Sequence, residues 1–521
     1  MRTIRLAFLA LTAVPSITIA QTGFNSRIDS TLTRSPAGQS ALEARAVLAK
    51  AILAAGGLPA LRAVSTISTE RSMLRTSTGQ GMRPGVAAVE HAILLNRLDL
   101  RSRRAFTLRD LEIDGGQIWG TSTIVTADSG FDINYANRTY FSRTSAQYAN
   151  FRVGLLRGEL PTLLLAAWNR PEQARSTGRV VIHGRACDGI IFADADGSLV
   201  TLYFDAATHL LARSELVADD ATRGDAAFST DYSEYRSVHA LKLPFRTQQD
   251  GPGPERWETT LARVELDAAL ADSLFVLPKE LDVSPNVVPM RKLADGVYAL
   301  QASVAVEFTD FVVVFEAYGN SRTSIGNIAR LRSAIPSKPI RYVISSHYHE
   351  DHLGGVREFA ALGATFITTR DAVDRLRSNL LVRHSMRPDS FSAAPKKPTI
   401  EIVDSVRVIG DETRRLELYQ IGPTAHVDRI LIGYLPKERI LIEGDLLDMP
   451  GQKPAAGGED TEQLADKIRE MRLDVAVIVP IHGSPASGTL QDLERAVAMH
   501  RARAKCSQEL VARLFCGFWR P

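Results

Sequence analysis

Three histidines and one aspartate stand within six consecutive positions of this chain. The segment runs from His347 to His352, and it follows the short apolar run Tyr342 to Ile344 and two serines. A run of this kind predicts a buried strand that ends at a polar turn. His347 and His349 are two residues apart, so in an extended segment both side chains leave on the same side and can bind one metal ion. Asp351 and His352 come where the strand turns toward a helix, and they can hold a second ion nearby.

The ligand types at this segment favour zinc. Histidine nitrogen and carboxylate oxygen are the donors expected of a catalytic zinc site, in which one position stays open for water. The chain has 11 histidines among 521 residues. A polar turn that is rich in histidine by chance is therefore a weak alternative.

Three more candidate ligands stand beside the ends of other apolar strands. His426 comes just before one predicted strand, while Asp445 and His482 directly follow two others. Each of them alone would be read as an ordinary turn residue, but with the first cluster they make a coherent set. The predicted arrangement has one ion held by His347, His349 and His426, the other held by Asp351, His352 and His482, and Asp445 bridging both.

These residues resemble the metallo-β-lactamase superfamily in full order. The resemblance rests on His347 to His352, His426, the Gly444-Asp445 pair and the His482-Gly483 pair, and it covers about Ala294 to Ala498. It implies an αββα sandwich with two zinc ions at one edge and usually hydrolysis. An aspartate at position 445 is similar to the glyoxalase II, lactonase and tRNA-processing nuclease branches, because the best-known β-lactamases carry a cysteine there. Glu316-Ala317 departs from the pattern, since many relatives have Asp-Thr or Asp-Ala, and this puts the support of the site by that loop in question.

The resemblance implies an exported dinuclear zinc hydrolase with two Zn²⁺ per chain. We expect it to cleave an ester, lactone, thioester or β-lactam bond of a small-molecule substrate by attack of a metal-bound hydroxide. Asp351 is the expected catalytic residue, because it can orient the nucleophile or accept its proton. The alternatives are an iron-dependent persulfide dioxygenase on the same fold, and a periplasmic lipid- or peptide-binding protein with a vestigial metal domain. A di-iron redox enzyme is disfavoured, since such proteins usually replace the second histidine with a carboxylate, and His349 is present.

Charge and the N-terminal segment bear on partners and location. The formal net charge is +3, which gives no argument for binding nucleic acid or an anionic membrane surface. Residues Met1 to Ala20 place Arg2 and Arg5 before a short apolar run that ends in small residues, which is typical of a secretory signal cleaved before Gln21. We therefore predict a periplasmic or secreted protein, with signal peptide 1–20 and no integral membrane segment after cleavage.

A change of pattern divides the mature chain into two predicted domains, 21–285 and 290–521. The first begins with an expected helix from Ser40 to Ala55 and continues as short alternating runs typical of an antiparallel meander, with one helix near Leu160 to Trp168. Its Tyr232 to Phe245 segment resembles the half-barrel of periplasmic lipoprotein carriers. This resemblance implies a cupped sheet able to hold an apolar ligand, or a spacer or docking module. Prolines around position 285 mark the boundary.

The second domain mixes strands and helices in an order that indicates a sheet with helices outside it. The predicted fold class is therefore α+β, with a C-terminal αββα sandwich preceded by an N-terminal antiparallel β-rich half-barrel. Single strands are expected at Val297 to Val304 and at Ile400 to Val408. His384 lies in a predicted loop near the site and could touch substrate, but an exposed loop histidine is the favoured interpretation. A helix from Leu490 to Phe515 would hold Cys506 and Cys516 about 15 Å apart, too far for a disulfide unless the helix breaks near Ser507.

Overall fold

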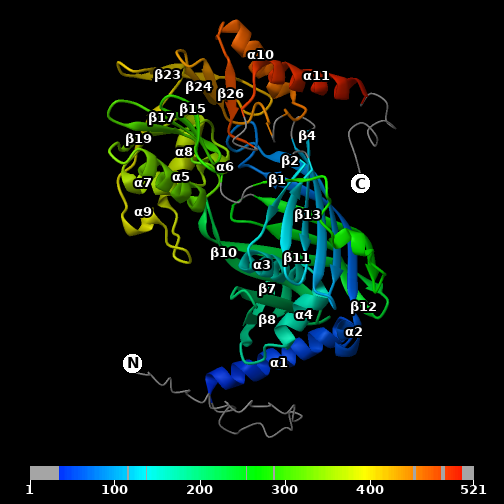
Figure 1. Ribbon diagram of the computed structural model, residues 1–521. Coiled ribbons are helices and arrows are strands. Elements are labelled where there is room, and N and C mark those ends of the chain that lie inside the picture. Colours follow the sequence, from blue (N-terminus) through cyan, green and yellow to red (C-terminus); the bar gives the residue numbers. More distant parts are fainter. Residues whose placement is uncertain are drawn as a thin grey trace, which may run out of the picture.

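The computed structural model describes residues 35–113, 117–135, 138–253, 255–284, 288–449, 453–482 and 487–506. A large curved sheet forms the N-terminal part, and a layered C-terminal part lies against one end of it (Figure 1). The predicted signal peptide, Cys516 and the side chain of Cys506 lie outside the described residues. None of the helices in the described ranges is long and apolar enough to cross a membrane.

The N-terminal part is built on one sheet of 14 strands, in the order β14-β6-β5-β4-β3-β2-β1-β13-β12-β11-β10-β9-β8-β7. Neighbours are antiparallel throughout except β14 with β6. The predicted antiparallel meander is therefore present. The strands are β1 (Thr66–Ser77), β2 (Ala88–Asp99), β3 (Arg104–Ile113), β4 (Gln117–Val125), β5 (Gly130–Asn134), β6 (Thr139–Ser142), β7 (Arg175–Ile182), β8 (Arg185–Ala193), β9 (Leu199–Asp205), β10 (Leu211–Asp220), β11 (Gly224–Val238), β12 (Leu241–Asp250), β13 (Arg256–Leu266) and β14 (Asp282–Val283).

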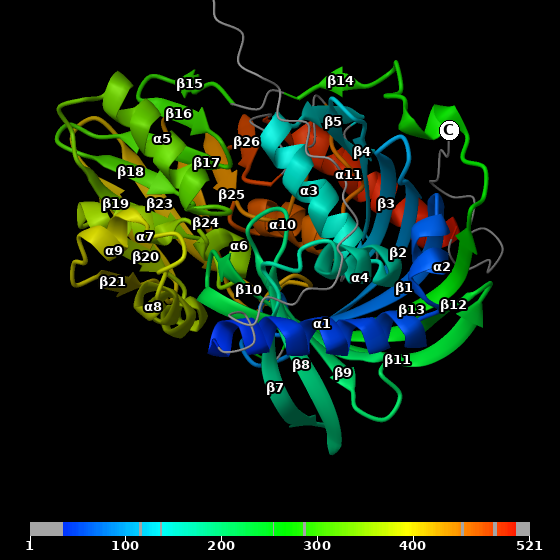
Figure 2. The same ribbon diagram turned by 90° about the horizontal axis from the view of Figure 1, so that it is seen from below.

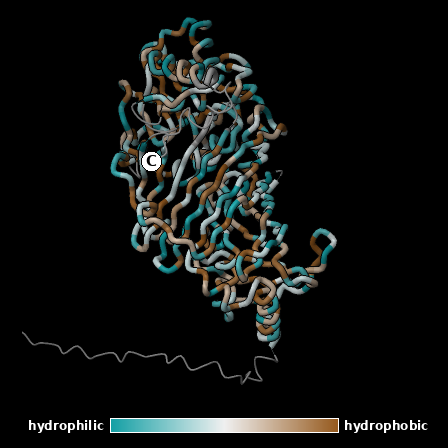
Figure 3. Tube along the Cα trace, turned by 90° about the vertical axis from the view of Figure 1, so that its right-hand side faces the viewer, coloured by the Kyte–Doolittle hydropathy of each residue, from teal (hydrophilic) through white to brown (hydrophobic). Residues whose placement is uncertain are grey.

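Buried and exposed side chains alternate along strands of this sheet. In the first half of β2, buried and exposed residues alternate one by one, as expected when one face of a sheet packs on a core and the other meets water. Hydrophobic and hydrophilic colours accordingly mix along the strands of the sheet (Figure 3). The sheet curves, and its concave side receives helices.

Two consecutive helices, α3 (Ser145–Arg157) and α4 (Leu160–Trp168), lie within the curve of the sheet (Figure 2). The predicted helix at Leu160 to Trp168 is α4. The sequence did not indicate α3, although Thr144 and Gln147 form a capping box at its start. Leu163 and Leu164 of α4 are buried in one core with side chains of the sheet. Side chains of α1 (Pro36–Ala54) and α2 (Leu58–Ala63) belong to the same core. The short turn η2 (Asp272–Phe275) follows β13.

The C-terminal part holds two facing sheets with helices on both outer sides. The first sheet has the order β15-β16-β17-β18-β19-β20-β21, and the second β22-β23-β24-β25-β26. Their strands are β15 (Arg291–Ala294), β16 (Val297–Leu300), β17 (Ser303–Glu307), β18 (Val312–Phe315), β19 (Ile340–Ser345), β20 (Thr365–Thr368), β21 (Thr399–Ile402), β22 (Val406–Gly410), β23 (Arg415–Ile421), β24 (Ile430–Leu435), β25 (Ile440–Glu443) and β26 (Val477–Pro480).

Three apolar cores define these layers. Side chains of both sheets, such as Phe315 and Leu431, share the central core. The first sheet packs outward on helices through residues such as Phe359, and the second through residues such as Leu464. The helices are α5 (Ser321–Ala334), α6 (Glu350–Leu353), α7 (Val356–Leu362), α8 (Val373–Leu381), α9 (Ser390–Ala393), α10 (Glu459–Glu470), α11 (Leu490–Cys506) and the turn η3 (Arg370–Ala372). The α+β class and the αββα sandwich are confirmed.

Two strand predictions were wrong, because each of the two segments predicted as a single strand contains two strands. The run from Val297 to Val304 is the start of a hairpin, because the chain turns at Ala302, whose φ is 48°. The run from Ile400 to Val408 crosses between sheets: β21 is parallel to β20 in the first sheet, whereas β22 is antiparallel to β23 in the second. Apolar periodicity does not show a change of sheet, because residues on both sides of the crossing are equally apolar.

Candidate metal centre

The first ligands stand where a buried parallel strand ends. β19 pairs in parallel with β18 on one side and β20 on the other, so a run rich in β-branched residues is favoured there. His349 keeps an extended backbone, with φ −60° and ψ 148°, and α6 begins at the next residue. β19 ends at Ser345 and α6 begins at Glu350, so His347 and His349 lie in the connection from strand to helix, and Asp351 and His352 lie at the start of the helix, where the chain was predicted to turn.

One group of ligand atoms comes from His347, His349, His426 and Asp445, all within 4.8 Å of one another. His426 Nε2 lies 3.3 Å from His347 Nε2 and 3.0 Å from Asp445 Oδ2. The Nδ1 atom of His347 is hydrogen-bonded to Ser346 Oγ at 2.8 Å. His347 therefore presents Nε2 to the group.

A second group comes from Asp351, His352, Asp445 and His482, again within 4.8 Å. His482 Nε2 is 3.0 Å from Asp351 Oδ2 and 3.2 Å from Asp445 Oδ1. His352 Nε2 is 2.9 Å from Asp445 Oδ1. The structure thus brings together all seven residues that the sequence singled out.

Asp445 divides its two oxygens between the groups. Oδ2 faces the first group, 3.0 Å from His426 Nε2, and Oδ1 faces the second, 2.9 Å from His352 Nε2. A carboxylate in this position can join two ions. The arrangement is that of two adjacent His/Asp sites, consistent with a dinuclear metal centre.

The chemistry of the donors fits a metal. His349 Nδ1 is buried without a hydrogen-bond partner among the described residues, and His352 Nε2 faces only the carboxylates of Asp445 and Asp351. Buried polar atoms left unpaired are costly, and a metal ion would satisfy them. Burial lowers the pKa of His347 well below its ordinary value and that of His349 to about 3, so both rings are neutral at pH 7 and able to coordinate.

The comparison with protein families agrees with this geometry. The family model described as "Metallo-beta-lactamase superfamily" matches residues 323–482, the stretch that contains all seven side chains. This stretch is a metallo-β-lactamase superfamily domain. The matched residues lie wholly in the C-terminal part, and with the two His/Asp groups they identify the metallo-β-lactamase domain as a metal-dependent hydrolase.

Solved structures similar to the chain carry related names. A metallo-β-lactamase from Pontibacter korlensis is 13% identical with a TM-score of 0.29, covering 55% of this chain and 98% of that one. FIM-1 from Pseudomonas aeruginosa, solved in its mono-zinc form, is 17% identical with a TM-score of 0.31, covering 42% and 98%. A metallo-β-lactamase from Hirschia baltica is 19% identical with a TM-score of 0.30, covering 41% and 98%.

Glu316 supports the metallo-β-lactamase site despite its departure from the family pattern. The residue is fully buried at the end of β18, and its backbone φ is 75°. Its Oε1 accepts a hydrogen bond of 2.9 Å from Ser346 N and lies 3.3 Å from His352 Nδ1. The carboxylate therefore contacts the ring of the predicted ligand His352, and it also holds the backbone of the turn that leads to His347.

Sequence reasoning missed two residues of the N-terminal part that touch this centre. Gln80 Nε2 donates to Asp351 Oδ1 at 3.1 Å, and Gly81 O accepts a hydrogen bond of 2.9 Å from His349 Nε2. Both stand in the connection between β1 and β2. The only signal in the sequence is the Gly79-Gln80-Gly81 triplet between two strands, which by itself reads as a turn.

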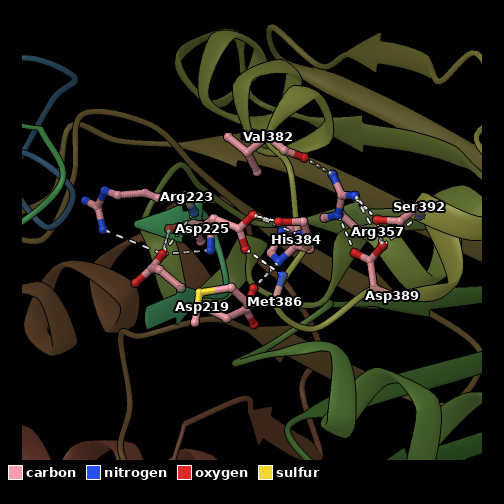
Figure 4. Close-up of polar contacts among 12 residues, drawn as sticks. Asp219, Arg223, Asp225, Arg357, Val382, His384, Met386, Asp389 and Ser392 are labelled. Atoms are coloured by element: carbon pink, nitrogen blue, oxygen red, sulfur yellow. Dashed lines mark hydrogen bonds and ion pairs between the residues drawn. The ribbon is translucent and has the colours of Figure 1, made fainter. Parts of the chain in front are cut away.

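The prediction that His384 is an exposed loop residue was wrong. The loop that follows α8 lies against the hairpin end of β10 and β11, where His384 Nδ1 is hydrogen-bonded to Asp219 Oδ1 of β10 at 2.7 Å (Figure 4). His384 is only 6% exposed. Asp225 accepts hydrogen bonds from the backbone nitrogens of Ser385 at 2.9 Å and Met386 at 3.0 Å. His384 therefore belongs to the contact between the two parts of the chain.

Proposed function

We propose that this protein is an exported dinuclear zinc hydrolase that cleaves an ester, lactone, thioester or β-lactam bond of a small-molecule substrate. The observation that carries the proposal is the Asp445 carboxylate, with one oxygen toward each group of ligands. Five imidazoles and two carboxylates are donors that suit zinc. The near-neutral charge of the chain favours a small substrate over nucleic acid.

Each side chain has a role in this proposal. His347, His349 and His426 would hold one ion, Asp351, His352 and His482 would hold the other, and Asp445 would contribute to both sites. Bound zinc supplies Lewis acidity toward a carbonyl oxygen and a nucleophile at neutral pH. Asp351 is the proposed catalytic residue: with Oδ2 it faces the ligand group, and its side chain is 28% exposed, so it can take the proton of the attacking nucleophile and pass it to solvent.

The test combines metal content with turnover of a small panel. The panel consists of nitrocefin, an acyl-homoserine lactone, a thioester and an aryl ester. We expect two zinc ions per chain, hydrolysis of at least one compound, and loss of at least 1,000-fold of that activity (about 4 kcal/mol) in the variant Asp351→Ala. Asp295→Ala is the matched control, because the Asp295 carboxylate is exposed and pairs with the exposed Lys292. Full turnover by zinc-loaded Asp351→Ala would refute the role of Asp351.

Metal analysis also separates zinc from the iron alternative. An iron-dependent persulfide dioxygenase on the same fold would purify with iron, absorb visible light and consume oxygen in the presence of a persulfide. Zinc is colourless and redox-silent. Iron at one equivalent together with oxygen consumption would replace the hydrolase proposal.

A second function, binding of an apolar ligand, is supported by a cavity in the N-terminal part. A space of about 560 Å³ lies between the α3–α4 connection and the concave face of the sheet, bordered by Leu94, Leu216 and Phe245. We expect the full chain to bind a fluorescent fatty acid, and Leu94→Trp to weaken that binding by narrowing the cavity. Binding that Leu94→Trp leaves unchanged would place the fatty acid elsewhere and remove the support for this function.

Export is proposed from residues 1–20 alone. N-terminal sequencing of the protein recovered from the periplasmic or culture fraction is expected to begin at Gln21. Recovery only from the cytoplasm, with Met1 retained, would contradict export.

A further inference from the structure

The loop between β1 and β2, residues 78–87, leaves the N-terminal sheet and enters the metal centre. We refer to it as the β1–β2 loop. Its Gly81 carbonyl accepts two hydrogen bonds from the ligand segment, one from the hydroxyl of Tyr348 and one of 2.9 Å from His349 Nε2. Gly81, Tyr348 and His349 are all buried. This carbonyl therefore lies directly behind a predicted ligand of the first ion.

The Gly81 contact determines which nitrogen of His349 faces the metal. A carbonyl oxygen can only accept, so the proton must lie on Nε2 and the lone pair on Nδ1. Nδ1 is buried and has no hydrogen-bond partner among the described residues. Hydrogen bonds of this kind to the second ring nitrogen orient metal-binding histidines and raise their basicity.

Gln80 likewise orients a predicted ligand, Asp351, but as a hydrogen-bond donor. Its amide Nε2 donates to Asp351 Oδ1 at 3.1 Å, while Asp351 Oδ2 stays within 3.0 Å of His482 Nε2. The two carboxylate oxygens are thus assigned to different partners. Since the Asp351 side chain is 28% exposed, it could otherwise turn toward water.

The β1–β2 loop is held in this place by further contacts with the C-terminal part. Met82 O accepts a hydrogen bond of 2.8 Å from Asp428 N, and Arg83 pairs with the Asp428 carboxylate at 3.1 Å. Asp428 is two residues from His426, so the loop spans from one ligand segment to another.

Glycines let the loop approach so closely. A Cβ on Gly79 would lie 2.1 Å from Glu350 Oε1, and a Cβ on Gly81 would lie 2.1 Å from Val86 O. Glu350 cannot easily move aside, because Arg223 and Arg375 both pair with it. Gly79 and Gly81 therefore leave no room for a side chain in the loop as it stands.

We propose that the β1–β2 loop of the N-terminal sheet completes the metal centre, with Gly81 and Gln80 as positioning residues for His349 and Asp351. The N-terminal part is then a component of the hydrolase site. This proposal rests on the proposed function, since it requires that His349 and Asp351 bind metal.

The test measures metal binding by the full chain. Gln80→Met keeps the length of the side chain and removes the donor to Asp351. We expect the dissociation constant of the more weakly held ion, measured by chelator competition, to rise about 10- to 100-fold, the usual cost of losing such a supporting contact. We also expect the visible absorption of the cobalt-loaded variant to differ from that of the cobalt-loaded wild type, which reports geometry at the metal without any turnover.

Gly81→Ala gives a second variant, because its new methyl group must displace the loop and its carbonyl. The expected result is weakened binding of the first ion and a changed cobalt spectrum, with secondary structure retained by circular dichroism. If Gly81→Ala does not fold, Gln80→Met alone tests the proposal. The matched controls are Gln248→Met, which removes a glutamine–aspartate contact remote from the ligands, and Gly154→Ala, whose methyl group meets no atom within 4 Å.

The outcomes separate this proposal from the function on which it rests. If the wild type binds two ions while Gln80→Met keeps its affinities within twofold and its cobalt spectrum unchanged, the loop proposal is overturned and the hydrolase proposal stands. A wild type that binds no metal overturns both.

Discussion

At the scale of single residues, Arg357 organises the segment that carries His384. The side chain of Arg357 is 3% exposed and pairs with the Asp389 carboxylate, itself 5% exposed. It also donates to backbone carbonyls at the end of α8, namely those of Asn379 and Leu380 and that of Val382 (Figure 4). One guanidinium thus ties the end of α8 to the start of α9.

This pair predicts a loss of stability in acid. Burial alone would raise the pKa of Asp389, but the hydrogen bonds from Arg357 and Ser392 outweigh it and lower the pKa to about 2. A carboxyl whose pKa is lowered by folding stabilises the protein above its ordinary value of 3.8 and loses that contribution as the pH falls toward 2. The contribution is roughly 2 kcal/mol.

Asp389→Asn should therefore lower the free energy of unfolding at pH 6, and the gap to wild type should shrink as the pH falls toward 2. Urea unfolding of both chelator-treated proteins between pH 2.5 and 6 measures this gap. Asp404→Asn, which removes an exposed pair with Arg370, is the control and should show almost no gap. A gap for Asp389→Asn that is constant with pH would contradict the assignment.

The seven predicted ligands could be read from the sequence because each lies beside the end of an apolar strand. Their residue types limit the chemistry, and their order in the chain matches a known family. Gln80 and Gly81 carry no such signal, since their role depends on a contact that spans 271 residues from Gln80 to Asp351. Glu316 shows the opposite case. It departs from the family pattern, yet its carboxylate still accepts a hydrogen bond from the backbone of the turn that leads to the ligands.

At the scale of elements, the connection between β10 and β11 joins the sheet to the ligand segment through Arg223. Its guanidinium pairs with Glu350 and lies 3.2 Å from Glu255 Oε1. Glu255 is 4% exposed and Glu350 14%. Burial and the nearby Glu255 charge raise the pKa of Glu350. Arg375 also pairs with Glu350 and Arg75 with Glu255, but Arg223 is the partner that the two carboxylates share.

Arg223→Met should lower the free energy of unfolding by about 3 kcal/mol, because it leaves two buried carboxylates without their shared partner. Adding Glu255→Gln should restore part of the loss, since the repulsion is then removed. Arg236→Met, which breaks an exposed pair with Glu234, should change stability by less than about 0.5 kcal/mol. Chemical denaturation of the wild type and these three variants measures the differences, and an Arg223→Met variant as stable as the wild type would show that the network contributes nothing.

At the scale of the whole molecule, polar contacts among the described residues join the curved sheet and the sandwich in two regions. One is the β1–β2 loop at the ligands, and the other is the β10–β11 hairpin, which contacts Glu350 and the loop after α8. Both sets of contacts involve the segment from His347 to α8 or its immediate continuation. Changes at the metal centre should therefore reach the N-terminal part.

Metal removal should loosen the β1–β2 loop as well as the ligands. Without an ion, the side chains of His349 and Asp351 lose their fixed orientation and their contacts with Gly81 and Gln80 weaken. Hydrogen exchange should become faster in peptides covering residues 78–87 and 347–352 after chelation, whereas β7, at the far edge of the sheet, should exchange as before. Faster exchange at 347–352 alone would show that the loop is independent of the metal.

The architecture of each part could be predicted, but their arrangement could not. Alternating strands indicated the meander, and the order of strands and helices together with the family resemblance indicated the sandwich. The contacts between the parts are made by turns and single side chains such as Gly81, His384 and Arg223, which leave no periodic pattern. A boundary at about residue 285 therefore suggested two separable units.

Truncation is where the β1–β2 loop has its most practical consequence. A fragment that starts near residue 290 would retain every predicted metal ligand. It would lack the β1–β2 loop and therefore the hydrogen bonds that the loop makes with His349 and Asp351. An inactive fragment of this kind would say little about the enzyme, and a domain swapped in from a relative would need a matching hairpin to go with it. The two halves are best cloned, evolved and crystallised as a single catalytic unit.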